Sequence, residues 1–216
     1  MKKTQTLKMA ILSLLFLFFI GCAGIPVRDE VKVDMKVPVG KIEGNLFTGI
    51  RFPFNVSAPP GWQVTTKYPE FMLKLGYDKE GLDESEVFVF NPVTQSHVQI
   101  DFTPAGRHAT FDQAKMEWLT NAAGGSFADE FHKDYGKNAA FEISATEAYK
   151  LKGVPFAAKR YTTYTIKGSK REHGWVYAFA EPYQIFIIYM ILEKEGSKDS
   201  QDIKAILDSF EVVTRK

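Results

Sequence analysis

The stretch YQIFIIYMIL, residues 183–192, is apolar almost throughout, with Gln184 as its one fully polar side chain. A continuous apolar run of this length is typical of a strand that is covered on both faces of its sheet. As a helix the run is too short to cross a bilayer, which takes about 20 residues. We therefore expect residues 183–192 to form a central strand with other elements packed on both sides.

The segments on either side of this run predict further strands joined by tight turns. Residues 156–166 and 172–180 flank Lys-Gly-Ser-Lys at 167–170, a composition typical of a hairpin loop. Residues 86–90 and 97–102 flank the turn-forming sequence NPVTQ and predict a second hairpin.

Two shorter alternating stretches complete the predicted sheet. Residues 141–145 alternate between apolar and polar side chains, and so do residues 50–57. Pro53 favours an edge strand or an irregular start, because proline cannot donate to a sheet ladder. The sequence APPGW at 58–62 then predicts a turn in which Gly61 can adopt a positive φ.

A first helix is predicted within TFDQAKMEWLTNAAGG, residues 110–125. Thr110 and Gln113 match a capping box at its start, and Gly124 with Gly125 predicts its end. The expected buried face of this helix consists of Phe111, Ala114, Trp118, Leu119 and Ala122.

A second helix is predicted over residues 202–210, which carry apolar side chains at helical spacing. Ser200 is its expected N-cap, and Asp199 and Asp202 favour a helix N-terminus electrostatically. Together these elements predict an α+β fold, an antiparallel β-sheet flanked by helices.

This order of elements resembles the PsbP-like fold, an α/β/α sandwich. The resemblance is carried by FPFNVSAPPGW (52–62) near the start and IKAILDSFEVV (203–213) at the end, and it covers about residues 46–213. The family includes an extrinsic photosystem protein and bacterial envelope lipoproteins such as the DcrB-like proteins. Its shared motifs are structural, so the resemblance implies a fold and an envelope setting and assigns no catalytic residue.

The N-terminus has the layout of a secretory signal peptide, a basic head followed by a twelve-residue apolar run over 9–20. Phe19, Ile20, Gly21 and Cys22 resemble the lipobox of bacterial lipoproteins, with Phe19 standing where leucine is usual. Cys22 is the only cysteine in the chain, which agrees with a thiol kept for acylation in an oxidising compartment. A plain signal peptide with an incidental cysteine, or an uncleaved anchor, is the alternative.

These features divide the chain into a lipoprotein signal peptide (1–21), a tether (22–45) with an edge strand over 31–37, and a PsbP-like domain (46–216). The resemblance to lipoproteins implies that the membrane is reached through lipidated Cys22. Because alanine rather than aspartate follows Cys22, it also implies the periplasmic face of the outer membrane. The chain after residue 21 retains 24 basic and 26 acidic side chains, so no basic field for nucleic acid is expected.

Candidate chemistry is sparse in this sequence. The four histidines His97, His108, His132 and His173 show no metal-ligand spacing. The polar segment DEFHKD (129–134) is interpreted as solvated chain after the first helix, with a hard-metal or zinc site as the alternative. No nucleophile elbow or phosphate loop is present, so we expect neither an enzyme nor a cofactor.

Two further groups of side chains are candidates for binding. Lys167, Lys170 and Arg171 lie at a hairpin tip, where they could touch lipid headgroups or an acidic partner or simply be solvated. The aromatic residues of the paired strands are explained by cross-strand packing, or they line a cleft between sheet and helix; they are Tyr161, Tyr164, Trp175 and Tyr177.

The sequence thus predicts a lipid-anchored, non-enzymatic envelope protein that binds a protein partner as an accessory or assembly factor. The alternative is an envelope lipoprotein that binds a small ligand or a metal in the sheet–helix cleft.

Overall fold

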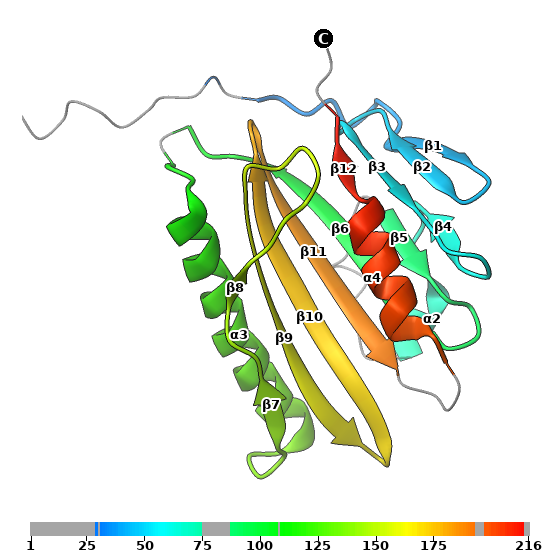
Figure 1. Cartoon of the computed structure of the whole chain (residues 1–216), viewed down its shortest axis with the longest axis vertical. Coiled ribbons are helices and arrows are strands. Elements are labelled where there is room, and N and C mark those ends of the chain that lie inside the picture. The colour runs from blue at the N-terminus through cyan, green and yellow to red at the C-terminus, as the bar shows by residue number, and fades with distance from the viewer. Residues whose placement is uncertain (1–28, 30, 75–86, 108, 193–196, 214–216) are drawn as a thin grey trace, which may run out of the picture. The chain divides into compact units, whose positions relative to one another are not determined.

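The computed structural model describes residues 29, 31–74, 87–107, 109–192 and 197–213 (Figure 1). Cys22 and the lipobox residues before it lie outside the described residues. Every helix and strand described here belongs to one compact unit, made of Val31–Ala105 and Phe111–Lys216. In the described part of the second unit the amide of Ala109 donates to the carbonyl of Gly106 at 3.1 Å. None of the helices in the described ranges has the length and apolar character needed to cross a membrane.

A large antiparallel sheet forms the centre of the main unit. Its strand order is β4-β5-β6-β11-β10-β9-β7, with β8 also paired to β9. The central position of β11 confirms the prediction made from YQIFIIYMIL, and the predicted hairpins β5–β6 and β9–β10 are both present. The bounds are β4 Gln63–Thr65, β5 Val87–Phe90, β6 His97–Pro104, β7 Phe141–Ile143, β8 Glu147–Ala148, β9 Phe156–Ile166, β10 Ser169–Ala180 and β11 Tyr183–Leu192.

A smaller sheet has the order β1-β2-β3-β12. Its strands are β1 Gly40–Glu43, β2 Leu46–Gly49, β3 Phe54–Ser57 and β12 Glu211–Val212. Strand β3 starts directly after Pro53, which agrees with the irregular start predicted from this proline. In the turn that follows, Gly61 has the predicted positive φ, 86°. The sheet joins the two ends of the domain, because β12 pairs antiparallel with β3.

The prediction of an edge strand over residues 31–37 is wrong. This segment is irregular and contains a turn in which the amide of Val37 donates to the carbonyl of Asp34 at 3.1 Å. The carboxylate of Asp34 also accepts from the amide of Lys36 at 2.9 Å, and such a local bond favours a turn over a strand. The first strand, β1, instead lies at the end of the range expected to be a tether.

Helices cover both faces of the large sheet. Helix α4 (Asp199–Ser209) packs on β11 and β6, and Figure 1 shows it in front of these strands. Helix α3 (Gln113–Tyr135) packs on β9 and β10, where the indole of Trp175 donates to the carbonyl of Thr120. Gly174, the residue before Trp175 on β10, pairs with Tyr189 under α4. Because consecutive strand residues face opposite sides, α3 and α4 cover opposite faces of the sheet. A short helix, α2 (Glu70–Lys74), buries Met72 against Phe88.

The main core lies between the large sheet and the layer formed by α4 and the small sheet. Phenylalanine rings dominate it: Phe54 stacks on Phe102 with 4.6 Å between the centroids, and Phe210 packs on Phe54 at a tilt with 5.6 Å between the centroids. Each such ring contributes about 2 kcal/mol through burial. The core therefore joins the FPFN segment at the start of the domain to the DSFE segment at its end.

Helix α3 differs from its prediction at both ends. It runs for 23 residues, continuing through Gly124 and Gly125. Its N-cap is Asp112, whose carboxylate accepts from the amide of Lys115 at 2.7 Å, so the expected Thr110–Gln113 capping box is not used. The DEFHKD segment consequently belongs to the last turns of this helix and does not follow it.

The buried face of α3 was predicted only in part, because Phe111 is buried just before the helix but the helical face itself differs. Met116, Thr120, Gly124 and Phe131 face the sheet, whereas Trp118 is exposed. At Gly124 a Cβ atom would lie 3.0 Å from both Arg160 and Ile143, so the absent side chain lets the helix approach the sheet. Tertiary packing here outweighs the weak helix propensity of glycine, which amounts to about 1 kcal/mol.

Candidate functional site

A cleft of about 420 Å³ lies between α4 and the face of β9, β10 and β11. This volume falls within the range typical of small-molecule sites. It occupies the sheet–helix position at which the sequence predicted a ligand cleft. The lining residues are Tyr149, Lys150, Lys159, Glu172, Tyr189, Ile191, Ser200, Ile203, Lys204, Leu207 and Asp208.

Tyr189 forms the floor of the cleft. Its ring lies over Gly174 of the neighbouring strand, where a Cβ atom on Gly174 would overlap the ring. The phenolic hydroxyl donates to Oε1 of Glu172 at 2.9 Å. Burial, reinforced by the Glu172 carboxylate, raises the pKa of Tyr189 far above its usual range. The tyrosine is therefore a neutral hydrogen-bond donor that holds the Glu172 carboxylate in place.

Lys159 of β9 lines the same cleft, and its ammonium group lies over the Tyr189 ring. Its Nζ lies 5.3 Å from the ring centroid of Tyr149 and 5.3 Å from that of Tyr189. Such cation–π contacts partly replace water around an ammonium group. Burial lowers the pKa of Lys159, and the nearby Glu172 and Glu147 carboxylates oppose that change. Lys159 is thus a partly desolvated cation held between two aromatic rings.

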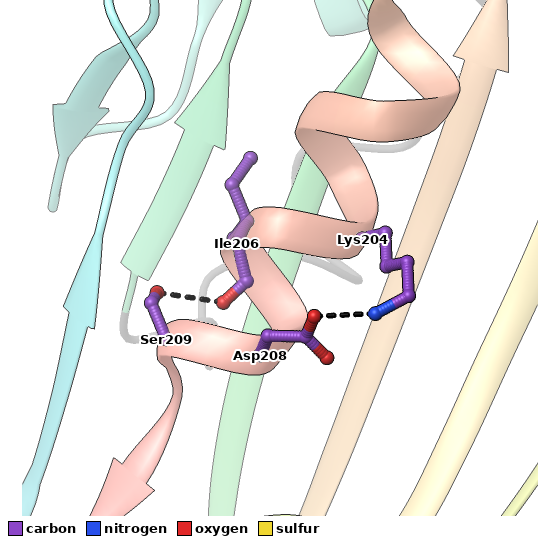
Figure 2. A network of polar contacts seen from close by, with 4 residues as sticks. All are labelled: Lys204, Ile206, Asp208 and Ser209. Atoms are coloured by element: carbon purple, nitrogen blue, oxygen red, sulfur yellow. Dashed lines mark hydrogen bonds and ion pairs between the residues drawn. The ribbon is translucent and has the colours of Figure 1, made fainter.

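The outer wall of the cleft is one face of α4. Figure 2 shows Lys204 and Asp208, one helical turn apart, joined by an ion pair, and the hydroxyl of Ser209 bonded to the carbonyl of Ile206. The side chains of Lys204 and Asp208 are 73% and 56% exposed. A pair so exposed contributes about 0.5 kcal/mol to stability, so its two charges can reorient toward a ligand at little cost.

Three polar contacts fix α4 over the sheet. The indole of Trp62 donates to Oδ2 of Asp202 at 2.9 Å, and the hydroxyl of Ser209 accepts from the amide of Ser57 at 3.0 Å. At the start of the helix the buried Asp199 accepts from the hydroxyl of Ser96 at 2.6 Å. Lys198, not Ser200, occupies the N-cap position. One of these contacts, from Ser57 to Ser209, joins the two sequence motifs, 52–62 and 203–213, that carry the resemblance.

The structure does not bring the three predicted basic side chains of the β9–β10 hairpin together. Lys167 forms the tight turn with Gly168, at φ values of 52° and 77°. Lys170 and Arg171 are consecutive on β10 and so point to opposite faces of the sheet. Lys170 is exposed beside Glu142, whereas Arg171 is partly buried and pairs with Tyr164 on the face that α3 covers.

The three histidines within the described ranges do not gather into a metal site. His97 and His173 flank Met190 across three adjacent strands, and His132 lies in the last turn of α3. His108 lies outside the described residues. Among the residues that the structure describes, no cluster of histidine, cysteine, aspartate and glutamate side chains could hold a metal ion.

The aromatic residues suggested by the sequence do not line the cleft. Tyr164 and Trp175 lie under α3, and Tyr177 stacks on Phe186 with 4.3 Å between the ring centroids. The cleft uses Tyr149 and Tyr189 instead. The sequence did not indicate Tyr189 as a site residue, because it lies within the apolar run 183–192 that predicts a buried strand. Only the β10–β11 register, which sets it opposite Gly174, reveals its position.

A second surface feature is Trp118 on the outward side of α3. Its side chain is 59% exposed, and Nζ of Lys115 lies 4.0 Å from the centroid of its ring. Ala114 and Ala122, one turn away on either side, are exposed and small, so the indole projects from the helix. A large exposed aromatic on a rigid helix is a common anchor for another protein.

Comparison with known proteins supports the fold. No family model and no curated protein matches the sequence. Among solved structures, cyanobacterial PsbP (CyanoP) from Synechocystis sp. PCC 6803 aligns with 82% of this chain and 99% of its own, at 11% identity and a TM-score of 0.54. This likeness shows that the chain has a PsbP-like fold.

Two further structures are less similar. LpqN, described as involved in cell envelope biogenesis of Mycobacterium tuberculosis, aligns with 74% of this chain and 83% of its own, at 12% identity and a TM-score of 0.49. A protein from Bacteroides thetaiotaomicron aligns with 81% of this chain and 50% of its own, at 10% identity and a TM-score of 0.47.

Proposed function

We propose that this chain is a lipid-anchored, non-enzymatic protein of the bacterial cell envelope that binds a protein partner as an accessory or assembly factor. In this proposal Cys22 carries the acyl chains and the PsbP-like domain faces the periplasm from the outer membrane. Two or more acyl chains give stable anchoring, whereas one gives only marginal binding. The basic head, the short apolar run and the FIGC sequence support this part of the proposal.

The observation that carries partner binding is the exposed indole of Trp118. Tryptophan is enriched among the side chains that supply most of the energy of protein interfaces. On α3 the ring is held by a rigid helix, and Lys115 covers one face of it. The small exposed neighbours Ala114 and Ala122 would let a partner approach the ring from both sides along the helix.

In-cell crosslinking of the full-length protein, followed by mass spectrometry, tests this function. The Trp118→Ala variant should lose a stoichiometric envelope partner that the wild type captures. Leu73→Ala, which removes a different exposed apolar side chain, is the matched control and should retain the partner. Equal capture by Trp118→Ala and wild type would exclude the α3 surface, and capture of no partner would count against the accessory role.

The small-ligand function is a second candidate, and the α4 cleft favours it. A cation between two aromatic rings, a fixed carboxylate and an apolar wall are the convergent groups typical of a ligand site. We retain this candidate in its small-ligand form, because the described residues offer no metal-donor cluster. Either candidate treats the protein as non-enzymatic. Turnover of a substrate that is lost in a Lys159 variant would overturn that assignment.

A further inference from the structure

We infer that the α4 cleft binds a small zwitterion with an apolar side chain, of the α-amino-acid class, with its carboxylate toward Lys159 and its ammonium group toward Glu172. This inference rests on the second candidate function, ligand binding in the cleft, and specifies the ligand. It is independent of the lipid anchor and of the Trp118 surface.

The anionic end of the ligand is assigned from Lys159. In the described part of the chain its ammonium group has no ion pair at bonding distance. It lies over the two tyrosine rings, and the carboxylates of Glu172, Glu147 and Asp208 act on it only from farther away. A partly buried charge is stabilised when it is paired and hydrogen-bonded. Its lowered pKa reflects the water it has already lost. A carboxylate entering the cleft would supply the missing partner.

The cationic end is assigned from Glu172. Its Oε1 accepts from Tyr189, and a carboxylate has further acceptor positions. Glu172 precedes Gly174 by two residues on β10, whereas Lys159 pairs with Val176, two residues beyond Gly174. The Tyr189 ring lies over Gly174, between these two strand positions. The floor is an aromatic ring with the Lys159 ammonium group over it and the Glu172 carboxylate bonded to its hydroxyl.

The rest of the lining carries both signs of charge, with Lys150 and Lys204 as further cations and Asp208 as a further anion, which suits a zwitterion. Lys204 and Asp208 already pair with each other, so the α4 side chains that line the cleft add no net charge to it. A polyanion such as phosphate would meet the carboxylates of Glu172 and Asp208 as well as the lysines. The apolar part of the ligand has its own wall, made of Ile191, Ile203 and Leu207.

Isothermal titration calorimetry on the full-length protein in detergent tests the inference. The probes are L-leucine, dileucine, the anion N-acetyl-L-leucine, the cation L-leucinamide and inorganic phosphate. L-Leucine should bind saturably, and each singly charged derivative at least tenfold more weakly. Tighter binding of dileucine than of leucine would assign the site to peptide termini, which share the same zwitterionic chemistry.

Variants locate the binding within the cleft. Lys159→Met keeps the aliphatic stem, and Glu172→Gln keeps an acceptor for Tyr189; each should weaken leucine binding at least tenfold. Lys41→Met on β1 is the matched control and should leave it unchanged. Thermal unfolding of each variant, with and without leucine, separates lost binding from lost folding.

The outcomes distinguish the two levels of the proposal. If N-acetyl-leucine, leucinamide or phosphate binds as tightly as leucine and depends on Lys159 or Glu172, the cleft is a ligand site but the zwitterion assignment is wrong. If no probe produces heat or shifts the Tm, both the assignment and the small-ligand function are overturned.

Discussion

The indole N–H of Trp62 donates to the carboxylate of Asp202 across 2.9 Å, joining residues 140 positions apart in the chain. Trp62 closes the turn after β3, and Asp202 lies in the first turn of α4. The bond therefore connects the first motif of the PsbP-like resemblance to the residue directly before the second, and it fixes the helix that forms one wall of the cleft.

Replacing Trp62 with phenylalanine should destabilise the fold. The change removes the donor and leaves the Asp202 carboxylate without this bond, and hydrogen bonds to charged groups contribute about 1.5–3 kcal/mol. We expect a loss of about 2 kcal/mol in the free energy of unfolding, measured by urea denaturation. Lys204→Met breaks the exposed pair with Asp208 on the same helix and should change stability by about 0.5 kcal/mol or less. Equal effects of the two variants would contradict the anchoring role of Trp62.

The consecutive glycines of α3 should respond differently to alanine. A Cβ atom on Gly125 meets nothing within 4 Å, so Gly125→Ala should stabilise the protein by about 0.5–1 kcal/mol through helix propensity. On Gly124 the added methyl group would press against Arg160 and Ile143 at 3.0 Å. Gly124→Ala should therefore be at least about 1 kcal/mol less stable than Gly125→Ala in thermal or urea unfolding. Equal stability of the two variants would show that α3 does not pack closely at Gly124.

Mild acid should destabilise the domain through two histidines, His97, which is fully buried, and His173, which is partly buried. Burial lowers the pKa of His97 and of His173 to about 4, against an ordinary value of 6.5. Between these values the unfolded chain binds more protons than the folded one, so stability is complete above pH 6.5 and falls as the pH drops toward 4. At pH 5 the loss is about 2 kcal/mol for each histidine relative to pH 7.5.

Unfolding curves at several pH values test this linkage. His97→Gln removes one titrating group and should reduce the pH dependence between 7.5 and 5 by about half. The variant's absolute stability can change, so the comparison is made on the slope against pH. An unchanged slope would show that His97 is protonated equally in the folded and unfolded chains.

Cys22→Ser should release the protein from membranes or stop its processing. Serine cannot form the thioether by which a lipoprotein cysteine is acylated. Membrane fractionation and metabolic labelling with palmitate, with the wild type in parallel, measure both effects. A variant that is cleaved and membrane-bound like the wild type would exclude lipidation at Cys22.

Much of the sheet could be predicted because its signals are local. The apolar run at 183–192 indicated the central strand β11, and the glycine-containing loop at 167–170 indicated the β9–β10 hairpin. Pro53 correctly indicated an irregular start of strand β3, because proline has no backbone N–H to donate to a neighbouring strand, whatever the strand's position in the sheet. Each signal acts through neighbouring residues alone, so it keeps its meaning before the chain folds.

The long helix and the cleft depended on contacts between distant segments. Gly124 and Gly125 predict a helix end in isolation, but α3 continues because Gly124 packs closely against the sheet. Lys159, Glu172 and Tyr189 belong to three strands, and only their antiparallel register places two opposite charges around one ring. Local patterns in the chain specified where strands and turns form. The site arose from the register and from the docking of α4, because side chains from separate strands become neighbours only when the sheet is assembled.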